Sequence, residues 1–196
     1  MNGPQTMLRL ALPLLLVAVL AVGLQLAGGP AAWRLERALW PAEPWRLLSA
    51  HLVHLGWAHF AMNLAGTVLG WWLVGRAFTA RQWAGIAAGC VVGIDLGLLW
   101  LSPGIDWYAG FSGVLHGLLA AGAAASLTRA PVMAGTLLAG LAVKLVLEQH
   151  GAGLAGTAHL IGAPVVVDAH LYGALAGAAG ALLLRTWRSR STSAPR

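Results

Sequence analysis

The sequence carries little charge: of its 196 residues, 9% are Asp, Glu, Lys or Arg, whereas 59% are hydrophobic. An average soluble domain has about 25% charged residues, so the composition argues against that class. Acidic residues are the scarcest charged type, with 6 Asp and Glu against 12 Lys and Arg. The one cysteine, Cys90, excludes an intramolecular disulfide and a cysteine-based metal site.

Long apolar runs, separated by short basic segments, predict an all-α integral membrane protein. The length allows about six spans of about 20 residues, so we expect a single domain over residues 1–196. Its core is expected at about 44–187, with a short basic tail, disordered, at 188–196. The 26 glycines fit this class because small residues let membrane helices approach closely.

The expected spans are residues 8–26, 55–74, 82–101, 112–127, 132–148 and 165–184. The first run has the basic start and small-residue end of a signal peptide, but it is long for one, and a retained helix is favoured. Residues 28–55 contain three tryptophans, and we expect this segment to lie at the level of the lipid headgroups.

Basic residues predict the orientation, because they accumulate on the cytoplasmic side of membrane proteins. With the N-terminus inside, the cytoplasmic set is Arg9, Arg76, Arg81, Arg129, Arg185, Arg188, Arg190 and Arg196, and the outer set is Arg34, Arg37 and Arg46. Both termini are therefore expected in the cytoplasm. The net charge of +6 is interpreted as a topology signal, and no nucleic-acid partner is expected.

Four polar residues of three expected spans share one depth in this orientation: His59, Asn63, Ser112 and His170. At a rise of about 1.5 Å per residue, they lie within roughly 5 to 12 Å of the outer surface. Polar side chains inside a membrane usually face the bundle interior and usually have a function.

This layer permits acyl-transfer chemistry. A serine hydroxyl is a weak nucleophile until an imidazole takes its proton, and His170 is the candidate base for Ser112. No third carboxylate is evident, since Asp168 faces another way on a helix, so a dyad is predicted. His59, Asn63 and the backbone N–H of Ser112 are candidate donors to an oxyanion.

Plainer roles remain open for the same residues. Ser112 can cap a helix, and His59 and Asn63 can hydrogen-bond between helices. Asp95 is expected to be neutral, or paired with Lys144 or with a group of the first span.

The remaining histidines, His51, His54, His150 and His159, lie in or near outer loops and are expected to be solvated or to anchor those loops. A metal site built from His51, His54 and His59 lacks a carboxylate, so we expect no metal and no cofactor.

Several motifs in order resemble the rhomboid family of intramembrane serine proteases. Gly110-Phe-Ser-Gly113 resembles its Gly-x-Ser-Gly, and His59-Phe-Ala-Met-Asn63 resembles its His-x-x-x-Asn. His170, with Gly173 three residues later, resembles its span-six histidine, while Trp45-Arg46 and His54 match further positions. The resemblance covers about residues 44–180 and implies a six-transmembrane-helix rhomboid-like bundle with a Ser–His dyad and, by analogy, a lid at 151–164 and a lateral gate at span five.

One branch of the family, rhombosortase, is the most similar, through Gly-Phe-Ser-Gly-Val-Leu-His-Gly and Asp-Ala-His-Leu-Tyr-Gly. The resemblance implies a protease in the bacterial inner membrane with its active site toward the periplasm. Its substrates would be transmembrane proteins with a C-terminal Gly-Gly, apolar helix and basic tail, and its surroundings membrane lipid; the oligomeric state stays open. The alternatives are a general rhomboid protease, an inactive rhomboid-like binding protein, and a small transporter, which would be expected to show internal repeats.

The sequence departs from the family at two positions. His116 stands where many bacterial rhomboids have a tyrosine, and is either an alternative packing ring or a second proton carrier; Ala50 stands where some have another histidine. Glycines on spans four and six, at positions 113, 117, 173, 177 and 180, predict a close approach that brings His170 to Ser112.

Overall fold

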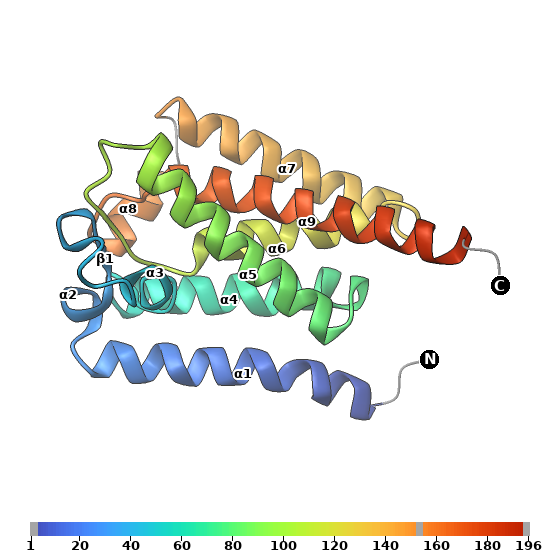
Figure 1. The fold of residues 1–196 in the computed structure, drawn as a ribbon, viewed down its shortest axis with the longest axis horizontal. Helices are drawn as coiled ribbons and strands as arrows, with labels where there is room; N and C mark the ends of the chain where they lie inside the picture. Colours follow the sequence, from blue (N-terminus) through green and yellow to red (C-terminus); the bar gives the residue numbers. More distant parts are fainter. Residues whose placement is uncertain (1–3, 152–154, 194–196) are drawn as a thin grey trace.

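The computed structural model describes residues 4–151 and 155–193, and this part of the chain is mostly helical. Its six longest helices are α1 (Pro4–Leu26), α4 (Trp57–Val74), α5 (Ala80–Leu96), α6 (Ser112–Ser126), α7 (Pro131–Gln149) and α9 (Val167–Ser193). They run up and down side by side, and α1 begins at the end of the bundle where α9 finishes (Figure 1). This arrangement agrees with the expected order of apolar segments.

Short elements gather at the opposite end of the bundle (Figure 1). Helices α2 (Gly29–Trp33), α3 (Arg46–Ser49) and α8 (Ala155–Ile161) lie there, with the 3₁₀ turn η1 (Arg37–Leu39). Strands β1 (Leu35–Glu36) and β2 (Trp107–Tyr108) pair antiparallel, Leu35 opposite Tyr108 and Glu36 opposite Trp107. The 3₁₀ turn η2 (Gly75–Ala77) follows α4, and the π-helical turn η3 (Gly97–Leu101) extends α5.

Two expectations about the ends of the chain differ from the structure. The predicted tail continues α9 as far as Ser193, because no glycine or proline interrupts residues 181–193; residues 194–196 lie outside the described part. The predicted lid at 151–164 contains α8 rather than only loop, while residues 152–154 lie outside the described part.

In the part of the chain that the structure describes, three helices are long and apolar enough to cross a membrane: Ala80–Leu101, Pro131–Gln149 and Val167–Trp187. Among the described residues, Leu12–Leu26 and Ser112–Ser126 form shorter apolar helices. A helix of 15 residues such as α6 is about 22 Å long, less than the roughly 30 Å of a bilayer's hydrocarbon core. The protein therefore has membrane-spanning helices, and the count of six spans stays a prediction.

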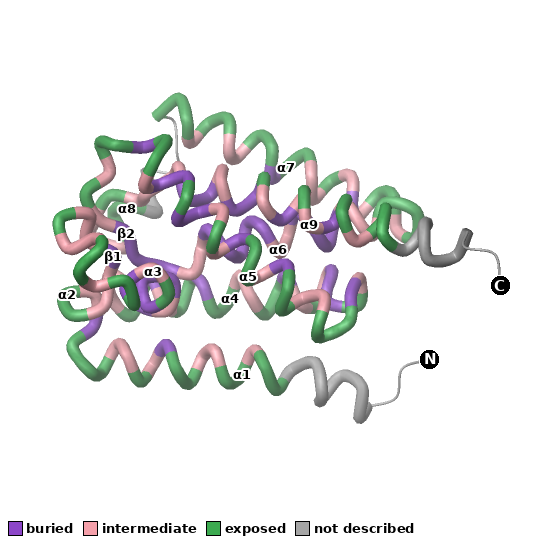
Figure 2. The backbone as a smooth tube through the Cα atoms, viewed as in Figure 1, coloured by how far each residue is buried: buried purple, intermediate pink, exposed green. Residues whose placement is uncertain are grey.

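Helix α6 forms the centre of the bundle, with nine buried residues between Gly113 and Ala123 (Figure 2). Helix α1 differs: of residues 12–26, only Ala21 is buried, and Leu15, Leu16 and Val19 are more than half exposed. An outer surface of leucine and valine suits contact with lipid rather than with water.

Glycines allow α6 and α9 to touch backbone to backbone. A Cβ atom at Gly173 would overlap the carbonyl of Gly113, and one at Gly177 would overlap the carbonyl of Gly117. This confirms the predicted close approach of the two helices. Gly180 differs, since a Cβ there would meet only Ile86 at 3.5 Å.

The Arg37 guanidinium connects η1 to η3 and to the loop after η3. It donates to the carbonyl oxygens of Ile105 at 2.9 Å, Leu99 and Ser102 at 3.0 Å, and Leu98. The last carbonyls of a helix have no intrahelical partner, so a buried helix end needs such donors. This contact fixes the start of the segment that leads to Ser112.

Candidate active site

The segment before Ser112 is held by backbone contacts that only glycine permits. Gly110 has φ +127°, its N–H donates to the carbonyl of Ala50 at 2.8 Å, and the Tyr108 hydroxyl donates to its carbonyl at 2.6 Å. A Cβ atom at Gly110 would lie 2.7 Å from the His59 ring. Burial raises the pKa of Tyr108, so this hydroxyl stays a neutral donor.

Ser112 is the first residue of α6, and its Oγ lies 2.9 Å from His170 Nε2. His170 belongs to the first turn of α9, and only 4% of its surface is exposed. Phe111 occupies the N-cap position without a side-chain hydrogen bond, so the Ser112 hydroxyl is not used as a helix cap. The structure thus brings together the two residues predicted as nucleophile and base.

Glu148, near the end of α7, is a site residue that the sequence reasoning missed. Its Oε2 lies 2.9 Å from His170 Nδ1, and its other oxygen pairs with Lys144 one turn earlier. The expectation that no carboxylate accompanies His170 is therefore wrong. The sequence did contain a signal for this contact: Glu148 ends the fifth expected span on the expected outer side, at the same expected depth in the membrane as Ser112. Asp168 instead accepts a hydrogen bond from Ser102 at 2.5 Å.

His116 lies against the other face of the site. Its ring stacks on that of His170, with centroids 4.1 Å apart and planes at 11°. Its Nδ1 lies 2.7 Å from the carbonyl oxygen of Ser112, so in the neutral ring Nδ1 carries the proton. This geometry favours the packing-ring interpretation over that of a second proton carrier.

His59 and Asn63 enter from α4. The Leu55 N–H donates to His59 Nδ1 at 3.4 Å, which leaves the proton of the neutral ring on Nε2. Asn63 Nδ2 is buried and has no hydrogen-bond partner among the described residues. A buried amide donor left unpaired costs free energy, so it is available to an acceptor that arrives with a ligand.

A small cavity of about 10 Å³ adjoins Ser112 and His59. It is lined by Leu55, Trp107, Tyr108, Ala109, Ile161, Pro164, Val165 and Val166 as well as these two residues. Ile161 of α8 and residues 164–166 after it therefore lie beside the serine, while their role as a lid stays a prediction. A volume of this size holds about one water molecule.

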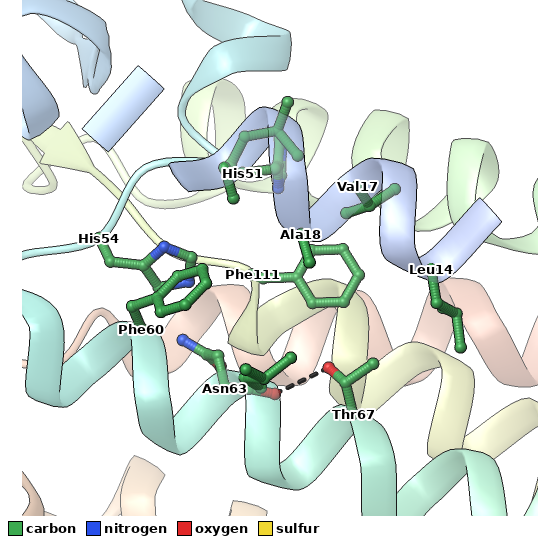
Figure 3. A pocket seen from close by; sticks show the side chains of 12 residues that line it. Leu14, Val17, Ala18, His51, His54, Phe60, Asn63, Thr67 and Phe111 are labelled. Atoms are coloured by element: carbon green, nitrogen blue, oxygen red, sulfur yellow. Dashed lines mark hydrogen bonds between the residues drawn. The ribbon is translucent and has the colours of Figure 1, made fainter. Parts of the chain in front are cut away.

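A second pocket, of about 40 Å³, separates α1 from α4 (Figure 3). Leu14, Val17 and Ala18 of α1 face Phe60, Asn63 and Thr67 of α4, and Phe111, the residue before Ser112, also lines the pocket (Figure 3). The Thr67 hydroxyl donates to the Asn63 carbonyl at 2.7 Å. Asn63 and Phe111 therefore line the same pocket.

Two of the histidines expected to be solvated or to anchor loops are buried, which leaves the anchoring role: His51 is 1% exposed and His54 is 2% exposed. His51 Nε2 lies 3.2 Å from Asp95 Oδ1, so the partner of Asp95 is neither Lys144 nor a group of the first span, the two partners that the sequence suggested. Burial, assisted by the nearby His59, lowers the pKa of His54 from 6.5 to about 3. His54 therefore packs as a neutral ring, edge-on to Phe60.

One group among the described residues has the spacing of a metal site. His116, Glu148 and His170 each offer a ligand atom, and these atoms lie within 4.8 Å of one another. Asp95, which lies 3.2 Å from His51, is a carboxylate that the sequence reasoning did not place beside His51, His54 and His59.

Comparison with known proteins identifies the fold to which this site belongs. The Rhomboid domain matches residues 41–187, which includes Ser112, His170 and Glu148. No curated protein and no solved structure matches the chain. Rhomboid proteins are in general intramembrane serine proteases. Since the match covers most of the sequence, the chain belongs to the rhomboid family.

Proposed function

We propose that this protein is an intramembrane serine endopeptidase in which Ser112 is the nucleophile and His170 is the general base. The observation that carries the proposal is the buried contact of 2.9 Å between Ser112 Oγ and His170 Nε2. A buried serine with an imidazole at hydrogen-bond distance has the arrangement required for nucleophilic catalysis. The family membership supports the same reaction class.

In the proposed reaction, Ser112 Oγ attacks the scissile carbonyl carbon while His170 Nε2 takes its proton. His170 then gives this proton to the leaving amine, and a water molecule, deprotonated in turn by His170, hydrolyses the acyl-enzyme. His59 Nε2–H, Asn63 Nδ2–H and the Ser112 N–H donate to the oxyanion. The unpaired state of Asn63 Nδ2 supports this role, because the donor acquires its partner only when the oxyanion forms.

The proposed substrates are membrane proteins with a C-terminal Gly-Gly, apolar helix and basic tail, as for rhombosortase, cut at the outer face of a bacterial inner membrane. The cavity beside Ser112, of about 10 Å³, supports a preference for residues without bulky side chains at the cut. A general rhomboid protease with other transmembrane substrates is the alternative. An inactive binding protein is disfavoured, since the serine and the histidine are both present and in contact.

The test uses two readouts on wild type, Ser112→Ala and His170→Ala. We expect a fluorophosphonate probe to label wild type and not Ser112→Ala, and a co-expressed reporter with the Gly-Gly sorting end to be cut by wild type alone. Equal labelling of wild type and Ser112→Ala would refute the nucleophile. Labelling of wild type with an uncut sorting reporter and a cut generic rhomboid substrate would refute only the substrate class.

A further inference from the structure

The Glu148 carboxylate is a charge placed deep in the protein beside the reactive pair. Its side chain is 9% exposed, and the His170 side chain is 5% exposed. A charged side chain in a membrane protein is costly unless it is paired. Lys144, one turn earlier on α7, pairs with one carboxylate oxygen, and His170 Nδ1 contacts the other at 2.9 Å. Lys144 therefore balances the charge of the Glu148 carboxylate, and the second carboxylate oxygen contacts His170.

This contact decides which nitrogen of His170 carries the proton. A neutral imidazole has one N–H and one bare nitrogen, and a carboxylate can only accept. Glu148 Oε2 therefore requires the proton on Nδ1, which leaves Nε2 bare toward Ser112 Oγ. Only that tautomer can take the proton of the serine.

The other groups that face His170 do not supply this control. His116 stacks on the ring face at 4.1 Å and directs its own Nδ1 to the Ser112 carbonyl. Among the described residues, neither His59 nor Lys144 forms a hydrogen bond with the His170 ring: His59 Nδ1 accepts from Leu55, and Lys144 donates to Glu148. Among the described residues, Glu148 is the one carboxylate in contact with the ring.

A metal ion held by His116, Glu148 and His170 is the competing use of the same atoms. The ammonium of Lys144, already paired with Glu148, opposes a second cation at that carboxylate. A metal ion bound at His170 Nδ1 would also displace the proton there and break the 2.9 Å contact with Glu148. The charge arrangement therefore favours the hydrogen bond.

We propose that Glu148 is a positioning residue that completes a Ser112–His170–Glu148 triad, with Lys144 balancing its charge. It holds the Nδ1–H tautomer of His170 in the resting enzyme and stabilises the imidazolium that forms when Ser112 is deprotonated. Because Glu148 lies on α7, the triad is complete only when this helix packs beside α9. The proposal rests on the proposed serine protease function.

The test compares Glu148→Gln, which keeps the size, and Glu148→Asp, which keeps the charge, with wild type. Glu36→Gln is the matched control, because Glu36 also pairs with a basic residue, Arg34 at 2.6 Å, but belongs to strand β1. The purified full-length variants are assayed for fluorophosphonate labelling rate, for kcat and KM on a cleaved reporter, and for thermal unfolding in detergent.

We expect Glu148→Gln to lower kcat and the labelling rate by about 10- to 100-fold, the effect of losing one hydrogen bond to a charged group, with KM nearly unchanged. The acidic limb of its pH–activity profile should move to lower pH, because the imidazolium loses its anionic partner. Glu148→Asp should recover part of the rate, and Glu36→Gln should match wild type.

Wild-type rates in Glu148→Gln, or activity and unfolding temperature lost in parallel in both Glu148 variants, would overturn the triad. Absence of labelling and cleavage in wild type itself would instead contradict the protease function, so the two failures are distinguishable.

Discussion

The role of His116 is decided by what the ring supplies beyond its stacking contact with His170. If it serves as a packing ring, His116→Phe keeps a planar ring there and loses only the hydrogen bond to the Ser112 carbonyl. One neutral hydrogen bond contributes about 1 kcal/mol, so we expect cleavage to fall by no more than about tenfold. A loss as large as that of His170→Ala, measured on the same reporter, would indicate a proton carrier instead.

The lowered pKa of the buried His54 predicts that acid destabilises the folded protein. Burial lowers the pKa of His54 to about 3 in the folded protein, whereas the ordinary value of 6.5 applies to the unfolded chain. Between these two pH values the unfolded state therefore binds one more proton at His54 than the folded state does. Stability is then lost as pH falls below 6.5, at up to about 1.4 kcal/mol per pH unit from this group. We expect His54→Phe to reduce the drop in unfolding temperature between pH 7 and 5, which thermal scans at a series of pH values would measure.

The exposed His159 is the matched control, because folding leaves its side chain in contact with solvent. His159→Phe should follow the wild-type pH dependence. If His54→Phe also follows it, burial of His54 is not a source of acid sensitivity.

Sequence reasoning selected Ser112, His170, His59 and Asn63 because each stands out as polar within an apolar run, and the structure places the first two in contact. It missed Glu148 for a physical reason. Glu148 lies at the edge of its run, where a charge needs no explanation, and its partner is 22 residues away on another helix. Spacing within one helix reveals neighbours at three or four positions, as it does for Lys144 and Glu148, but not contacts between helices.

At the scale of the helices, the contact between α6 and α9 positions the serine relative to the histidine. A Cβ atom at Gly177 would overlap the Gly117 backbone, which cannot move aside as a side chain can. We expect Gly177→Ala to lower the free energy of unfolding by about 1–3 kcal/mol, the usual cost of overpacking, and to reduce cleavage by separating Ser112 from His170. Unfolding in detergent and reporter cleavage would measure the two effects.

Gly140→Ala on α7 provides the comparison, since a Cβ atom there meets nothing within 4 Å. Alanine is the better helix former by about 1 kcal/mol, so this variant should be as stable as wild type or more so. Equal effects of the two substitutions would show that the α6–α9 contact has no special role.

Most helix positions were predictable from the sequence, because apolar runs bounded by arginine or proline mark α4 to α7 within a few residues. The contacts of the loops between these helices were not predictable from the sequence. Arg37 was counted only as a topology charge, whereas it binds four carbonyl groups in η3 and the loop after it. Such contacts join segments that are far apart in the sequence, so local residue patterns do not predict them.

For the whole molecule, the remaining question is how the bundle lies in a membrane, and the arginine distribution predicts that the short elements face outward. Ala42 is exposed among these elements, and Thr128 is exposed in the connection between α6 and α7 at the other end. The native Cys90 is fully buried, so it provides a silent background for introduced thiols. We expect a membrane-impermeant maleimide to label Ala42→Cys in intact spheroplasts, and Thr128→Cys only after the membrane is permeabilised. Labelling of Thr128→Cys before permeabilisation would reverse the orientation and place Ser112 near the cytoplasmic side. Labelling of both in intact cells would contradict an odd number of crossings between the two positions, and with it the six-span arrangement.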